Sequence, residues 1–207
     1  MSNDPFESEE WAELGARLLT IAAALEQSGI PYGFGGAIAY NYVGEPRGTR
    51  DIDINIFLPQ TEAIETLVVL NQIGMHIDLS EATDTIRRIG QIRLYWDHVP
   101  VDLFFSTVPL HDASQQRLRM VPFRGRIIPV LSGEDLTLCK VAFNRQDDWS
   151  DIRNVLAVQQ SRFDLVYVRR WMYDMFPDDD ERVQRFERLV EQLVVWGVLG
   201  RDALQKK

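Results

Sequence analysis

Three aspartates and a pair of glycines are the residues of this sequence whose types and spacing could do chemistry. Asp51 and Asp53 lie two positions apart in the run Asp-Ile-Asp-Ile-Asn-Ile, which alternates polar and apolar residues as a half-buried strand does. Side chains at such spacing lie on the same face of a strand. Two neighbouring acids repel each other unless a cation lies between them, and hard divalent ions such as Mg²⁺ bind carboxylate and phosphate oxygens together.

A third acid, Asp102, lies in the otherwise apolar run Val-Pro-Val-Asp-Leu-Phe-Phe. If this run is a strand that neighbours the strand of Asp51 and Asp53, three carboxylates converge at one edge of a sheet. Two of them could bridge a pair of ions about 3.5–4 Å apart, the arrangement used for in-line phosphoryl or nucleotidyl displacement. The third could help to deprotonate the attacking hydroxyl.

The two glycines, Gly35 and Gly36, lie between an expected strand over 30–34 and an expected short helix over 37–43. Glycine lets the backbone approach a ligand closely, and the N-terminus of a helix can receive an anion. These positions therefore favour a phosphate-binding turn. A plain strand–helix turn is the alternative.

A dinucleotide-binding site is a further interpretation of the glycines, because Gly33 and Gly35 have the spacing of the first two glycines of that motif. We reject it because Ile38 occupies the third glycine position, and its bulk opposes close packing of helix on strand. For the acids the alternative is structural: Asp51 could cap a turn while Asp53 faces solvent on an edge strand.

The composition is that of a globular protein, with 207 residues, 45% hydrophobic and 26% charged. The excess of 31 acidic over 22 basic residues, a net charge of −9, argues against a protein whose whole surface coats nucleic acid. A single cysteine, Cys139, excludes an intramolecular disulfide framework and a Cys-rich zinc site. The apolar runs are shorter than the roughly 18 residues of a membrane helix, and the acidic N-terminus resembles no secretory or mitochondrial signal. We therefore expect a soluble, cytoplasmic protein with no membrane partner.

The hydrophobic periodicity changes near residue 131. Before that point we expect helices over 8–29, with Ser8 as a cap, and over 61–74, and strands over 51–58, 91–97, 99–105, 119–123 and 126–130. After it we expect helices over 132–145, 149–160, 163–176 and 180–196. The predicted fold class is α+β, with a mixed β-sheet flanked by helices over 1–131 and a C-terminal helical domain over 132–207.

Taken in order, Gly35-Gly36, Asp51-Ile-Asp53 and Asp102 resemble the motifs of the DNA polymerase β-like nucleotidyltransferase superfamily. The family pattern is an apolar residue, Gly, then Gly or Ser, a helical spacer, Asp-x-Asp and a later strand carboxylate, and every position is filled here. The lead-in Arg47-Gly-Thr-Arg50 is similar to that of small-substrate and toxin-type members. These include the aminoglycoside nucleotidyltransferases and the toxin halves of abortive-infection systems. The resemblance covers about residues 10–160.

The resemblance implies a nucleotidyltransferase-like fold and a Mg²⁺-dependent enzyme that moves NMP from an NTP, such as ATP, to an acceptor hydroxyl with release of pyrophosphate. It implies that Asp51, Asp53 and Asp102 are the catalytic residues and bind Mg²⁺, two ions being expected with the NTP bound.

The resemblance also implies which residues bind the nucleotide. Gly35 and Gly36 would contact the triphosphate through the backbone. The residues themselves leave open whether Arg47 and Arg50 steer the triphosphate or form a salt bridge to Glu45, and Arg50 is the candidate for the nucleotide site. Members often carry a lysine on a later helix that reaches the triphosphate, and Lys140 is the candidate because the only other lysines end the chain. The alternative for Lys140 is a solvated helix position.

The acceptor is not readable from the sequence. The net charge favours a small cationic molecule over bulk nucleic acid, while a tRNA end bound through the arginines of 117–126, or a protein, stays open. His76, His98 and His111 show no metal-ligand spacing. Two rival functions remain: a non-catalytic member of the same fold that binds a nucleotide or a partner, and an interaction protein that binds a protein partner through its C-terminal helices.

Overall fold

The computed structural model describes residues 9–205, so Ser8, the expected cap of the first helix, lies outside the described residues. The chain divides into two compact units. Unit 1 comprises Met1–Ile38 and Arg47–Leu131, and unit 2 comprises Ala39–Pro46 and Ser132–Lys207. None of the helices in the described part of the chain combines the length and the apolar character that a membrane crossing requires.

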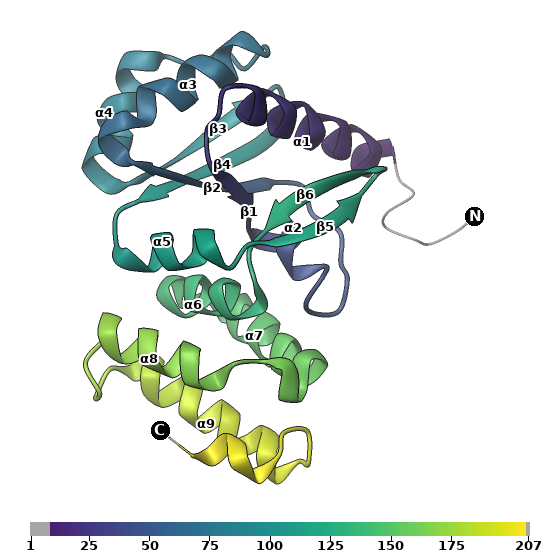
Figure 1. The fold of residues 1–207 in the computed structure, drawn as a ribbon, viewed down its shortest axis with the longest axis vertical. Coiled ribbons are helices and arrows are strands. Elements are labelled where there is room, and N and C mark those ends of the chain that lie inside the picture. Colours follow the sequence, from purple (N-terminus) through teal and green to yellow (C-terminus); the bar gives the residue numbers. More distant parts are fainter. Residues whose placement is uncertain (1–8, 206–207) are drawn as a thin grey trace. The chain divides into compact units, whose positions relative to one another are not determined.

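Unit 1 is built on a six-stranded sheet in the order β3-β4-β2-β1-β6-β5 (Figure 1). The sheet is mixed, because β2 pairs with β4 and β1 with β6 in parallel, while the other neighbours are antiparallel. The strands are β1 (Tyr32–Phe34), β2 (Ile52–Pro59), β3 (Gln91–Trp96), β4 (Val99–Ser106), β5 (Arg119–Phe123) and β6 (Arg126–Val130). The mixed sheet with its helices confirms the expected α+β fold class.

Helices α1 (Glu9–Gln27), α3 (Ala63–Gln72) and α4 (Leu79–Ile89) lie on one side of the sheet of unit 1, and α5 (Pro109–Gln116) lies on the other side (Figure 1). The hydrophobic core includes Leu18 of α1, Ile54 of β2 and Leu103 of β4, each 0% exposed. Burying such a side chain contributes about 1.5–3 kcal/mol to the free energy of unfolding. A 3₁₀ turn (Gln60–Glu62) precedes α3.

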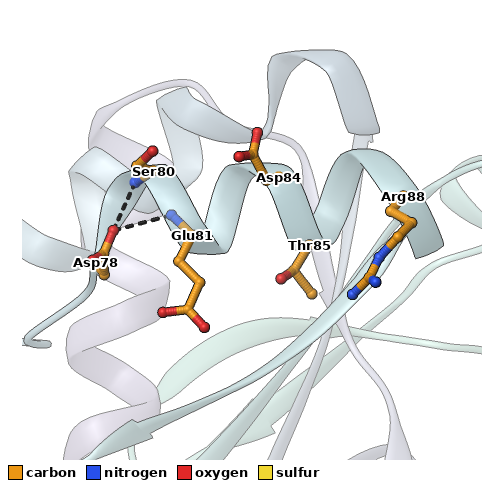
Figure 2. Close-up of a pocket in the computed structure, with 6 residues that line it drawn as sticks. All are labelled: Asp78, Ser80, Glu81, Asp84, Thr85 and Arg88. Carbon is orange, nitrogen blue, oxygen red and sulfur yellow. Dashed lines mark hydrogen bonds between the residues drawn. The ribbon is translucent and has the colours of Figure 1, made fainter.

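Helices α4 and α5 were not predicted from the sequence, although α4 carries clear signals at both ends. The Asp78 carboxylate accepts hydrogen bonds from the backbone amides of Ser80 and Glu81, both 3.0 Å long (Figure 2). This is N-terminal capping, which satisfies amides that have no partner within the helix. At the other end Gly90 has φ 73°, the left-handed conformation that commonly ends a helix.

Unit 2 is helical, with α6 (Gly133–Phe143), α7 (Gln146–Gln159), α8 (Leu165–Met175), α9 (Glu181–Val195) and 3₁₀ turns at Gln160–Arg162 and Arg201–Leu204. It also takes residues 39–46, which the sequence had placed with the first domain. Two bonds tie this segment to α7: Asn154 donates to the Tyr40 hydroxyl, and Gln159 donates to the carbonyl of Val43. The helix α2 (Gly36–Tyr40) therefore begins in unit 1 and ends in unit 2. The expected division into a catalytic domain over 1–131 and a helical domain over 132–207 stays a prediction.

Candidate active site

The first acid of the site is placed by the alternation of strand β2. Ile52, Ile54 and Ile56 are at most 1% exposed, because they lie on the face of the sheet that forms the core. Asp53 lies between the first two of them and therefore points to the opposite face. Burial of the isoleucines thus determines the direction of the acid.

The second acid lies directly beside the first. Strands β2 and β4 are parallel neighbours, and Asp53 and Asp102 are register partners. Neighbouring strands are about 4.8 Å apart, so the two carboxylates start from adjacent positions on the same face. The two negative charges repel each other at this spacing unless a cation lies close by.

A cation does lie there, and it is Arg93, a residue that the sequence analysis did not single out. Arg93 on β3 is the register partner of Asp102. Its guanidinium donates two hydrogen bonds to the Asp102 carboxylate, 2.8 Å from Nε and 2.5 Å from Nη2. The bonds to Asp102 raise the pKa of Arg93 above its usual value. Asp53, Asp102 and Arg93 therefore form a row of charges across three adjacent strands.

The signal for Arg93 was present in the sequence. The expected strands 91–97 and 99–105 adjoin each other around His98, and in the structure Trp96 pairs with Val99. Counting back from this tight turn along an antiparallel pair places Arg93 opposite Asp102.

The third acid, Asp51, comes immediately before β2 and is held by its own segment. Its carboxylate accepts a hydrogen bond of 2.5 Å from the Thr49 hydroxyl. The Arg93 guanidinium lies 3.9 Å from the same carboxylate, so a single arginine contacts both Asp51 and Asp102. The structure thus brings the three predicted acids to one region of unit 1.

The two glycines pack closely against the acids' strand. The Gly35 amide donates a 2.9 Å hydrogen bond to the carbonyl of Asp53. A Cβ on Gly35 would lie 2.8 Å from the side-chain amide of Asn55, and one on Gly36 would overlap the Asp53 carboxylate. Gly36 also has φ +48°, which side chains disfavour. Because α2 is a single short turn, its dipole adds little, and the close approach to Asp53 is the structural use of the pair.

The two expected nucleotide-binding side chains, Arg50 and Lys140, differ in their surroundings. Arg50 is exposed. Lys140, on α6 of unit 2, is only 8% exposed, so the alternative of a solvated helix position is wrong. Its ammonium nitrogen lies 3.2 Å from a carboxylate oxygen of Asp148 and 2.8 Å from one of Asp151. A direct contact of Lys140 with a nucleotide stays a prediction.

The donor set of the site fits a hard divalent ion. Among residues 9–205, no three His, Cys, Asp or Glu side chains are gathered closely enough, as they stand, to hold a metal. Carboxylate oxygens are nevertheless the ligands that Mg²⁺ prefers, and two of these carboxylates start from adjacent register positions. A positive group, the Arg93 guanidinium, already lies among them.

Comparison with known proteins identifies the fold. No protein-family model matches the sequence, and neither does any curated protein. The structure is similar to the solution structure of the antibiotic-resistance factor ANT(2'')-Ia, with a TM-score of 0.53 and 13% identity over 73% of this chain and 86% of that chain. It is also similar to an antigenic nucleotidyltransferase-like protein from Paracoccidioides brasiliensis, with a TM-score of 0.51 and 16% identity over 95% of this chain and 94% of that one. The chain therefore has the nucleotidyltransferase fold that its resemblance to the DNA polymerase β-like superfamily implies.

Proposed function

We propose that this protein is a Mg²⁺-dependent nucleotidyltransferase, which moves NMP from an NTP such as ATP to an acceptor hydroxyl and releases pyrophosphate. The observation that carries the proposal is the register pairing of Asp53 with Asp102, beside the Gly35-Gly36 turn, on a nucleotidyltransferase fold. A sheet that served only as scaffold would gain nothing from two adjacent acids on one face.

In this proposal Asp51, Asp53 and Asp102 hold the metal, two ions being expected with the NTP bound. Bound Mg²⁺ would neutralise charge on the phosphates and favour in-line displacement. The Gly35-Gly36 turn, which lies directly against Asp53, would contact the triphosphate through its backbone.

The reaction itself needs little covalent chemistry from the protein. The acceptor oxygen attacks the α-phosphorus of the NTP, and the bond from that phosphorus to the oxygen that bridges to the β-phosphorus breaks. Pyrophosphate leaves with the electron pair of that bond, and the hydroxyl proton passes to a carboxylate, for which Asp102 is the candidate. Positioning and charge neutralisation then supply most of the rate enhancement.

Two basic residues would bind the nucleotide. The Arg50 side chain is exposed next to Asp51 in the chain, where a guanidinium would meet triphosphate oxygens. Lys140 would reach phosphate only by leaving Asp148 and Asp151, which now surround it. Arg50 is therefore the better supported of the two.

For the acceptor we propose a small cationic molecule, because the chain carries a net charge of −9. The similarity to an antibiotic-resistance factor is consistent with a small-molecule acceptor. A tRNA end or a protein is the alternative, and a toxin that modifies either would slow growth on expression and lose that effect on substitution Asp51→Ala.

One observation favours a second candidate function. Arg93 already pairs with Asp102, so this acid has a cationic partner without a metal, as it would in a non-catalytic nucleotide-binding or partner-binding protein of this fold. Such a protein would bind nucleotide, if at all, independently of Mg²⁺.

The experiment is thermal unfolding of the protein with each of the four NTPs, with and without Mg²⁺. A ligand at 100 times its Kd raises the free energy of unfolding by about 2.7 kcal/mol, which is readily measured. We expect a Mg²⁺-dependent shift with at least one NTP, lost in Asp53→Asn and kept in Asp84→Asn, an exposed acid on α4. Pyrophosphate release with aminocyclitols or tRNA then identifies the acceptor. Stabilisation without Mg²⁺, or none at all, contradicts the proposed enzyme.

A further inference from the structure

Arg93 holds Asp102 at the same atoms that the proposed reaction needs for the metal. Its two hydrogen bonds to Asp102 use the carboxylate oxygens through which that acid would bind a metal. The same guanidinium lies 3.9 Å from Asp51. A guanidinium and a divalent cation on the same oxygens would repel each other at close range. Arg93 and the metal therefore cannot both hold Asp102 in this way.

We propose that Arg93 is a further nucleotide-binding residue, which pairs with Asp102 and Asp51 in the metal-free protein and moves to the donor's phosphates when the metal–nucleotide complex binds. The inference rests on the proposed function, because it concerns the same site. According to this proposal, Arg93 competes with a metal ion for Asp102 when no nucleotide is present, and it binds the phosphates of the metal–nucleotide complex.

The surroundings of Arg93 allow the movement. Strand β3 is an edge of the sheet, and the Arg93 side chain is 50% exposed, whereas that of Asp102 is 13% exposed. A long side chain at an exposed edge can change rotamer without disturbing the core. The planar fork of a guanidinium matches phosphate oxygens as well as it matches a carboxylate, so the donor offers an equivalent partner.

A purely structural role explains the pair less well. An ion pair with a half-exposed partner contributes little to the free energy of unfolding. The β3–β4 pairing is already maintained by backbone bonds along six register pairs. Arg93 is thus placed where it does little for the fold and controls the charge of two proposed metal ligands.

The test measures metal binding directly, with Mn²⁺ as the probe and electron paramagnetic resonance of the free ion as the readout. Without nucleotide, Arg93→Gln should bind Mn²⁺ about tenfold more tightly than the wild type, because the competitor is gone. With a non-hydrolysable NTP analogue present, the same variant should bind the Mn²⁺–analogue complex about tenfold more weakly. Arg87→Gln removes an exposed arginine of α4 and should change neither affinity.

The outcomes separate this inference from the proposed function. If the wild type binds Mg²⁺–NTP through Asp53 but Arg93→Gln has unchanged or weaker Mn²⁺ affinity, Arg93 is structural and only the inference fails. If neither protein binds Mn²⁺ or nucleotide, both fail. A second variant, Arg93→Lys, keeps a charge without the fork. It should compete with the metal better than Arg93→Gln does, and its thermal unfolding checks that the edge strand is intact.

Discussion

The carboxylate of Asp53 occupies the space in which a side chain on Gly36 would begin. The chain turns there with φ +48°, and the preceding amide, that of Gly35, is bonded to the Asp53 carbonyl. The glycine turn and the acid are therefore one structural feature, in which the backbone lies directly against a proposed metal ligand.

Substitution Gly36→Ala tests this relationship. The added methyl group must displace the Asp53 carboxylate, so Mg²⁺-dependent stabilisation by NTP should be lost. The left-handed backbone should cost about a further 1–2 kcal/mol of unfolding free energy. The control is Gly29→Ala, because Gly29 has a comparable φ of +67° but open space around its Cβ position. The control should lose similar stability and keep its NTP response; equal NTP responses in the two variants would contradict the steric argument.

Lys140 offers a test that separates stability from nucleotide binding. Lys140→Met leaves the buried acids Asp148 and Asp151 without their cation, which should lower the free energy of unfolding by about 3–5 kcal/mol. Replacing both acids with asparagine in the same variant should restore much of the loss. This rescued protein lacks the ammonium group but is folded. We expect it to bind Mg²⁺–NTP at least about tenfold more weakly than the wild type, and an unchanged Kd would limit Lys140 to a structural role.

His111 predicts a pH dependence of stability. Its Nδ1 accepts a 3.1 Å hydrogen bond from the Thr107 amide, and burial lowers the pKa of this imidazole from its ordinary 6.5. Below about pH 6.5 the unfolded chain therefore binds more protons at His111 than the folded chain does. The free energy of unfolding decreases as the pH falls, until the pH reaches the lower pKa of His111 in the folded protein. One proton limits this slope to about 1.4 kcal/mol per pH unit.

The measurement for His111 is chemical denaturation from pH 7 to pH 5. His111→Gln keeps a hydrogen-bond acceptor at the third position of α5 but cannot be protonated, so its pH profile should be flatter than that of the wild type. His76→Gln removes an exposed imidazole and should leave the profile as it was. A profile as steep in His111→Gln as in the wild type would assign the pH dependence to other groups.

Much of the fold was predictable because its information is local. Alternation over 51–58 predicts strand β2 and the face of Asp53, and the tight turn near His98 predicts the β3–β4 hairpin. Helix α4 was predictable from Asp78 and Gly90 and was missed. Helix α5 is short and gives a weaker pattern, since its first turn depends on Pro109 and His111.

The site was predictable only where local patterns sufficed. That Asp53 and Asp102 are partners depends on which strands become neighbours, and periodicity within either strand carries no such information. The resemblance to a family supplied it instead. The partners of Lys140 lie on the next helix, so whether this lysine is solvated or paired depends on how α6 and α7 pack, which no single-helix pattern reveals.

The most buried ion pair of unit 2 predicts a large effect on stability. Arg169 of α8, only 4% exposed, donates to both carboxylate oxygens of Glu187 on α9, at 2.9 and 2.8 Å. The same guanidinium donates to the carbonyls of Ala203 and Gln205, and so holds the C-terminal 3₁₀ turn against the helices. Nearly all of its donors therefore have partners within unit 2.

Arg169→Met should consequently lower the free energy of unfolding by about 3–5 kcal/mol, because it leaves the Glu187 charge and two carbonyls without donors. Arg170→Met, one position along and exposed, should change it by no more than about 0.5 kcal/mol. The measurement is urea denaturation followed by circular dichroism. Adding Glu187→Gln to Arg169→Met removes the uncompensated charge and should recover part of the loss. Equal effects of Arg169→Met and Arg170→Met would show that the pair contributes nothing beyond an exposed arginine.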